Sequence, residues 1–202
     1  NVGGGGDARN TAVGQLAGAA VTTGVQNTLI GALAGDALTD ADHNVAVGLN
    51  ALTADTLGSK STAIGTGALG TQNFTSATNV YNTAVGYDAG VAVTTGIQNT
   101  LIGGLVADNL TTGKNNVAVG YQALETEDTG DRSVAIGSFT LKTQNNDADN
   151  YNTAVGYAAG LSVTTGVNNT LIGGLAGDAL TDADSNTAIG TNSLATDRLG
   201  SR

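Results

Sequence analysis

A short pattern of alternating polar and apolar positions recurs along the whole chain. It reads Asn or Ser, Thr or Val, Ala or Leu, Val or Ile, then Gly, and it begins at Asn10, Asn27, Asn44, Ser61, Asn82, Asn99, Asn116, Ser133, Asn152, Asn169 and Asn186. Alternation with a period of two, together with β-branched residues and a closing glycine, favours a short strand over a helix. The pattern therefore predicts eleven short, equivalent strands.

The spacing of the motif predicts how these strands are connected. Successive copies begin 17 residues apart, except after the fourth copy, where the gap is 21 residues, and after the eighth, where it is 19. Helical repeats need about 33 residues for two helices, so this period is too short for them. Seventeen residues suit two short strands and two turns, which is one coil of a parallel β-solenoid. Eleven coils at ~4.8 Å would form an all-β rod about 50 Å long.

The two longer gaps divide the chain into larger units. We expect a Gly-rich lead-in or partial coil at residues 1–9 and one β-roll repeat domain at 10–202, with super-repeats at 10–81, 82–151 and 152–202. The extra residues fall in two expanded turns, Gly70–Tyr81 and Leu141–Tyr151. Insertions in solenoids emerge as loops on one face and often carry binding.

Each motif position is expected to form a column along the rod. Asn side chains should stack as a hydrogen-bonded ladder, and Val or Ile should face the core. The glycines should supply positive φ or close backbone approach. Small residues three positions after each glycine should face outward, against a neighbouring chain. The columns are represented by Asn10, Val13, Gly14, Asn27, Ile30, Gly31, Asn82, Val85, Gly86, Asn152, Val155 and Gly156.

Composition and charge exclude several classes of protein. The 202 residues carry 17 acidic and only seven Lys or Arg side chains, a net charge of −10, so a nucleic acid partner is not expected. No apolar run approaches 18 residues, so no membrane insertion is expected of this segment. Hydrophobic residues make up 40%, too many for a solvated coil. Cysteine is absent, which excludes disulfides and thiolate metal sites.

Candidate chemistry is sparse, and we predict that the chain is not an enzyme. His43 is the only histidine, which argues against a Ser-His-Asp constellation. Two acidic turns offer pairs of carboxylates, and Ca²⁺, the only cofactor considered, takes such oxygen ligands. The alternative, which we favour, is that these acids are solvated turn residues that keep the rod soluble. The weak Ca²⁺ candidates are Asp40, Asp42, Asp182 and Asp184.

The few aromatic residues gather next to the motif and in the expanded turns. Tyrosine is favoured at contact surfaces because it offers a large, rigid area at a low entropy cost. Candidate contact residues are Phe74, Tyr81, Tyr87, Tyr121, Tyr151 and Tyr157.

The motifs NTAVG, NVAVG and STAIG, followed by Ala-Gly or Ala-Leu, carry a family resemblance. They resemble the YadA-like head repeats of trimeric autotransporter adhesins, and the longer forms at 82–90 and 116–124 resemble repeats of phage and viral tail fibres. The resemblance implies a left-handed β-roll, a side-by-side homotrimer and an extracellular place on a cell surface or virion tail fibre. It implies a non-enzymatic structural and adhesive segment that attaches to a host receptor or glycan.

Two other functions are compatible with a solenoid. A self-assembling extracellular filament would share every feature of the fold. An ice-binding solenoid would need outward threonines in a regular array, and the Thr/Val column provides the spacing. Because that column shares a strand face with Val and Ile, we expect it to point inward, which argues against ice binding.

Overall fold

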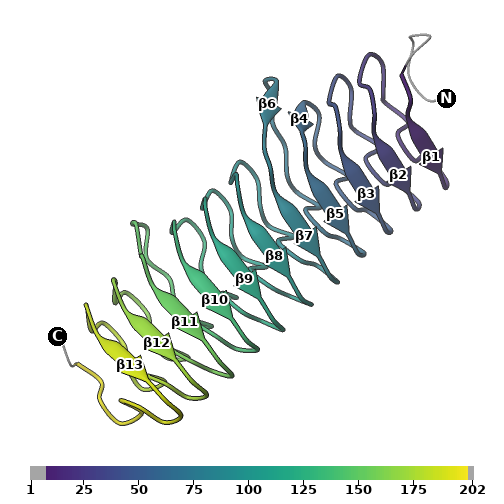
Figure 1. The fold of residues 1–202 in the computed structure, drawn as a ribbon. Coiled ribbons are helices and arrows are strands. Elements are labelled where there is room, and N and C mark those ends of the chain that lie inside the picture. The colour runs from purple at the N-terminus through teal and green to yellow at the C-terminus, as the bar shows by residue number, and fades with distance from the viewer. Residues whose placement is uncertain (1–7, 200–202) are drawn as a thin grey trace.

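The computed structural model describes residues 8–199, which form a parallel β-solenoid of about eleven coils with no helix. Residues 1–7 of the expected lead-in and residues 200–202 lie outside the described range. Figure 1 shows the strands side by side along a straight rod, with the turns of each coil extending to both sides of the strands. The predicted all-β parallel solenoid and its 17-residue coil are confirmed.

One three-residue strand per coil builds the main sheet, and each lies within a copy of the motif. The order of the strands in the sheet is their order in the chain. All pairs are parallel and in register, so that Thr83 lies beside Thr100 and Val85 beside Ile102. The strands are β1 (Thr11–Val13), β2 (Thr28–Ile30), β3 (Val45–Val47), β5 (Thr62–Ile64), β7 (Thr83–Val85), β8 (Thr100–Ile102), β9 (Val117–Val119), β10 (Val134–Ile136), β11 (Thr153–Val155), β12 (Thr170–Ile172) and β13 (Thr187–Ile189).

The prediction of two strands per coil is wrong for most coils. Within residues 8–199 a second strand occurs only as β4 (Gly58–Ser59) and β6 (Thr78–Asn79), which pair with each other. The return segment, which runs from the motif glycine to the next motif, bends through left-handed residues such as Leu105, with φ 52°, and Ala107, with φ 45°, and the coil that carries β4 does the same at Leu52, with φ 54°. Its backbone still bonds to the next coil, as between Thr94 N and Thr111 O at 2.9 Å.

The motif glycines combine the two properties expected of them. Gly86 has a φ of +142°, and a Cβ added there would lie 2.2 Å from the carbonyl oxygen of Gly103 in the next coil. The same overlap recurs between the motif glycines of neighbouring coils along the rod, for example 2.4 Å between Gly103 and Gly120. Only glycine therefore allows the coils to stack at this corner.

The asparagines form a ladder, but between Asn82 and Asn116 its bonds join side chains to backbone and not amide to amide as expected. Asn99 is fully buried, and its backbone N–H donates to Asn82 Oδ1 at 2.9 Å while its Nδ2 donates to Gly113 O at 2.8 Å. Asn116 N donates to Asn99 Oδ1 in turn. The Asn99 side chain thus bonds two backbone groups of the turn that precedes β9 in the next coil, Gly113 O and Asn116 N, which would otherwise be left unpaired in the interior.

The predicted inward column of Val and Ile is wrong, because the strands face the other way. The middle residue of the strand is buried, as with Ala84 and Leu101, whereas Ile102 is 39% exposed. Val85 and Thr83 are half-buried. The interior of the coil is narrow, and its width is filled by Ala or Leu from the strand meeting Leu or Val from the return segment. The β-branched column is left on the outer face of the sheet.

The column of small residues three positions after the motif glycine is also reversed. We expected it to face a neighbouring chain, but Ala34, Ala89 and Ala159 have no exposed surface. They pack inside the coil as part of the continuous apolar core. The chain turns at the motif glycine, with Ala89 N donating to Gly86 O at 3.4 Å, and this turn directs the position into the coil.

Candidate functional site

The outer face of the main sheet is a regular surface that runs along the rod. Each of its eleven strands presents Thr or Val at the first position and Val or Ile at the third, with no charged residue at either. The isoleucines of the inner coils keep 38–39% of their surface exposed, namely Ile30, Ile64, Ile102, Ile136 and Ile172. An uncharged β-branched face thus runs along the rod.

Exposed tyrosines border this face two residues beyond the Val column. Tyr87 and Tyr157 are 59% exposed and Tyr121 is 47% exposed. Phe139 stands between Tyr121 and Tyr157 and meets both edge-to-face, with ring centroids 5.6 and 5.8 Å apart. These rings widen the apolar surface of the sheet along one side.

The two expanded turns present a second kind of surface. Tyr81 and Tyr151 each lie in the left-handed region, with φ of 58° and 50°, and are 51% and 53% exposed. Phe74 is only 8% exposed, which corrects its prediction as a contact residue. Its ring is turned into the rod beneath the first expanded turn and is unavailable to a partner.

A buried polar network lies under each expanded turn and was not predicted. Gln72 Nε2 donates to Ser61 Oγ at 3.0 Å, and Gln72 Oε1 accepts from Asn82 Nδ2 at 2.9 Å. Gln144 joins Ser133 to Asn152 in the same way, at 2.8 Å each. The glutamines therefore carry the asparagine ladder across the turns where extra residues interrupt it. Serine instead of asparagine in the preceding coil is the sequence signal that could have revealed them.

Each network also contains a buried carboxylate. Asp55 accepts hydrogen bonds from Gly58 N, Phe74 N and Gln72 Nε2 at 3.0, 3.1 and 2.6 Å. Glu127 occupies the equivalent place in the second super-repeat, where it accepts from Gly130 N at 2.8 Å and Gln144 Nε2 at 2.9 Å. Both side chains are fully buried.

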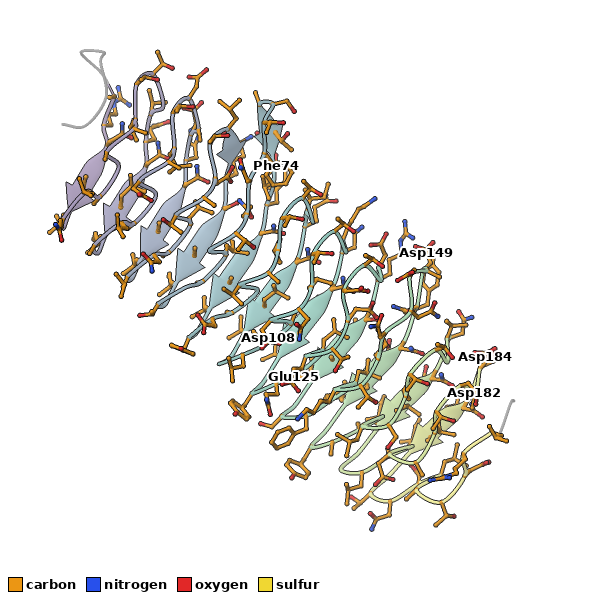
Figure 2. All side chains as sticks on the ribbon, turned by 180° about the vertical axis from the view of Figure 1, so that it is seen from behind. Phe74, Asp108, Glu125, Asp149, Asp182 and Asp184 are labelled. Carbon is orange, nitrogen blue, oxygen red and sulfur yellow. The ribbon has the colours of Figure 1, made fainter. Side chains whose placement is uncertain are left out.

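Acidic side chains also gather on the edge of the rod opposite the expanded turns. In Figure 2, Asp108 and Glu125 lie along this edge, whereas Phe74 and Asp149 lie along the other. Lys142 Nζ is 3.0 Å from Glu125 Oε2. Partial burial, and then the charge of Glu125, raise the pKa of Asp108 above its ordinary value.

Asp108→Asn is expected to stabilise the protein by a few tenths of a kcal/mol at neutral pH, because solvent screens this half-buried group. The folded state binds the Asp108 proton more readily than the unfolded state, so the ionised form costs stability above the raised pKa. The gain should vanish as the pH falls below the unfolded value. Urea unfolding at several pH values measures it.

Asp36 provides the matched control for that substitution. It holds the same position in the first super-repeat, but Thr53 Oγ1 donates to its Oδ1 at 2.6 Å. Asp36→Asn should therefore give no gain at neutral pH. Equal stabilisation by both substitutions would show that Glu125 and burial are not the cause.

The four weak Ca²⁺ candidates lie on the edge that carries the expanded turns, where Figure 2 labels Asp182 and Asp184. Asp42 Oδ1 accepts from Val25 N and Asp184 Oδ1 from Val167 N, both at 2.8 Å, and Asp40 Oδ1 accepts from Thr23 Oγ1. Asp40, Asp42 and Asp184 thus bond the preceding coil, a role not expected from the sequence, whereas Asp182 Oδ1 accepts from Thr181 Oγ1 of its own coil. Among residues 8–199 no group of three or more His, Asp or Glu side chains is placed to share a metal ion.

His43 lies exposed in one of the turns, with a left-handed φ of 61°. Over the range that the structure describes, no helix is long and apolar enough to cross a lipid bilayer.

Comparison of the chain with protein-family profiles, with curated proteins and with solved structures found no match. The resemblance to adhesin and tail-fibre repeats therefore stays a prediction that rests on the sequence motifs.

Proposed function

We propose that this chain is a non-enzymatic rod segment of a surface or virion fibre, in which three copies pack through the outer face of the main sheet. The exposed Val/Ile column is the observation that carries the proposal. With a strand of three residues about 10 Å long and a rod about 50 Å long, the face covers roughly 500 Å². An exposed patch of this size is at the upper end of what monomeric proteins present and often marks an interaction site.

The number of copies follows from the resemblance, and the physics of the coil favours association. Each coil is thin and has little interior, so burying Ile102 and its equivalents between chains would add apolar burial that a single coil lacks. The aromatic strip of Tyr87, Tyr121, Phe139 and Tyr157 continues the same surface. The rod then serves as a rigid extension from its anchor and as an attachment surface for a host receptor.

Charges placed in the middle of the face are expected to separate the chains. Val119→Glu with Ile136→Glu would place carboxylates in a desolvated interface, which is strongly unfavourable. Both side chains are at least partly exposed in a single chain, so the far-UV circular dichroism should not change. The native mass should fall from three chains to one.

A control with the same added charge uses Thr95→Glu and Thr112→Glu, two exposed residues outside the face. This variant should keep the mass of the unmodified protein. If the variant with Val119→Glu and Ile136→Glu keeps the native mass of the unmodified protein, the proposed interface is contradicted.

The orientation of the strands also favours a second candidate, ice binding. The Thr/Val column lies on the outer face and not inward as expected, and Thr83 and Thr100 repeat at the spacing of the coils. Ice binding needs this face free of a partner chain. A monomer that slows ice growth, and loses this activity with Thr83→Lys and Thr100→Lys, would support it over the fibre.

A further inference from the structure

The two expanded turns lie on the same edge of the rod, four coils apart. In Figure 1 the loop that carries β6 and the loop that precedes β11 rise on the same side of the rod. In Figure 2 Phe74 and Asp149, from these two loops, lie along one edge. Tyr81 and Tyr151 end coils that are four apart, which places the turns roughly 19 Å from one another along the rod.

Each turn presents a tyrosine ring together with a cation from the preceding coil. Lys60 Nζ lies 5.3 Å from the centroid of the Tyr81 ring, and the Arg132 guanidinium lies 5.6 Å from that of Tyr151. Such contacts fix the ring and hold the cation in one place. The same turn position in an unexpanded coil carries residues such as Gln98, so the pairs belong to the expanded turns alone.

The second pair also holds an acceptor. Arg132 forms an ion pair with Asp149, and Tyr151 Oη donates to Asp149 Oδ2 at 3.3 Å. The guanidinium has five N–H donors in a planar fork, so pairing with one carboxylate leaves others directed at solvent. In the first pair, Lys60 Nζ donates to Tyr81 Oη at 3.4 Å. Both pairs thus combine a half-exposed ring with fixed polar groups.

The interior beneath these turns is less favourable than that of the other coils. At the positions of Val93 and Leu110, which are buried apolar residues, the neighbouring coils carry Glu127 and Gln144. A buried carboxylate with no cation beside it costs stability unless hydrogen bonds compensate, and apolar residues in such places are often neutral or stabilising.

The network does hold the loop in place. Glu127 Oε2 accepts from Asn150 Nδ2 at 3.1 Å, and Asp55 Oδ1 accepts from the backbone N–H of Phe74. Asn150 is fully buried, and its Oδ1 has no hydrogen-bond partner. A turn that served only as a spacer would not need such an interior, whereas a turn that presents a contact site benefits from being held rigid.

We propose that the two expanded turns are paired contact sites for a neutral saccharide chain, which Tyr81 and Tyr151 bind by stacking. This inference rests on the proposed function and names the partner class of its attachment surface. The face of an aromatic ring is negative and attracts the partly positive C–H groups of a pyranose. Lys60 donates hydrogen bonds to sugar hydroxyls, while Arg132 and Asp149 offer both donors and an acceptor.

The charge of the rod favours a neutral ligand over an anionic one. The chain has a net charge of −10, and the carboxylate of Asp149 already pairs with Arg132. A polyanion would meet a repulsive field along the rod. A neutral chain that spans both turns gains from binding at two linked sites, and the apparent affinity then exceeds that of either site.

The test uses the whole chain on a microarray of neutral, sialylated and sulfated oligosaccharides. The unmodified protein should bind neutral oligosaccharides, and binding should change little with added salt. Tyr81→Ala or Tyr151→Ala should each weaken binding on the order of tenfold or more, and the two together on the order of a hundredfold or more. Tyr81→Phe and Tyr151→Phe keep the ring and should stay within about threefold.

Gln98→Ala is the matched control, because it truncates the same turn position in a coil between the two sites, and it should leave binding unchanged. Binding confined to acidic oligosaccharides, no binding to any saccharide, or full binding by the double alanine variant would overturn the inference. None of these variants touches the outer sheet face. A trimer without saccharide binding therefore rejects this inference alone, whereas a monomer rejects the proposed function.

Discussion

Gly86→Ala is expected to lower the free energy of unfolding by about 3–5 kcal/mol, the largest effect we predict for a single methyl group. The residue has a φ of +142°, which side chains other than that of glycine rarely adopt, and its new Cβ would meet the Gly103 carbonyl oxygen at 2.2 Å. That oxygen belongs to backbone stacked in register and cannot rotate away. Urea unfolding followed by far-UV circular dichroism measures the loss.

Gly190→Ala separates the two causes. Gly190 has a comparable φ of +118°, but a Cβ added there would have no atom within 4 Å. Its substitution should cost only the backbone strain, about 1–3 kcal/mol. If both substitutions cost the same, coil-to-coil contact at the motif glycine does not limit the stacking distance.

Exchanging the sizes of two core residues is expected to give a large and non-additive effect. Leu101→Ala should cost about 2–5 kcal/mol through the cavity that it leaves. Gly90→Leu should cost a similar amount alone, because a Cβ at Gly90 would lie 2.5 Å from Leu101 Cδ1. The double variant should recover most of the loss, since each change makes room for the other.

The chain itself contains the exchanged arrangement. Leu124 and Leu141 occupy the position of Gly90 in their coils, at φ of 56° and 47°, and the following strands carry Ala135 and Ala154 in place of Leu101. A left-handed leucine is therefore accepted where the neighbouring strand residue is small. The double-mutant cycle should give a coupling of about 2–3 kcal/mol. Simple addition of the two losses would contradict this complementarity.

Much of the fold could be predicted from the sequence because a solenoid repeats the local structure of one coil eleven times. The motif at Asn99 and its equivalents specifies a strand, a ladder residue and a corner glycine together, and the 17-residue period places like residues beside one another. The register seen between β7 and β8 follows directly from this. Few alternative pairings of strands remain, so the topology could be predicted correctly.

The direction in which the strands face could not be predicted from the motif alone. In a three-residue strand such as Thr100–Ile102, two β-branched residues on one face suggest a core, but a narrow coil accommodates Leu101 opposite Leu110. The information lies in the residue four positions after the motif glycine: a strand with a central Leu follows a coil with Gly there, as with Gly90 and Leu101, whereas Leu there is followed by a strand with a central Ala. This matching of residue sizes is visible in the sequence only when four successive coils are aligned.

The candidate surfaces were predicted in part. Tyr81 and Tyr151 lie exposed as expected, whereas Phe74 is buried because the loop folds its ring inward. The polar interior at Asp55 and Glu127 escaped prediction because charged residues in turns usually face solvent. Their burial can be inferred only when the 17-residue period is used to align them with the buried core residues of the other coils.

The native mass of the chain in solution, measured by light scattering after size exclusion, tests the central claim most directly. We expect a single species with three times the 19.7 kDa of one chain, because the outer sheet face needs a partner. A monomer would contradict this and turn attention to ice growth on the free face. Large polydisperse species would also contradict it and favour a filament.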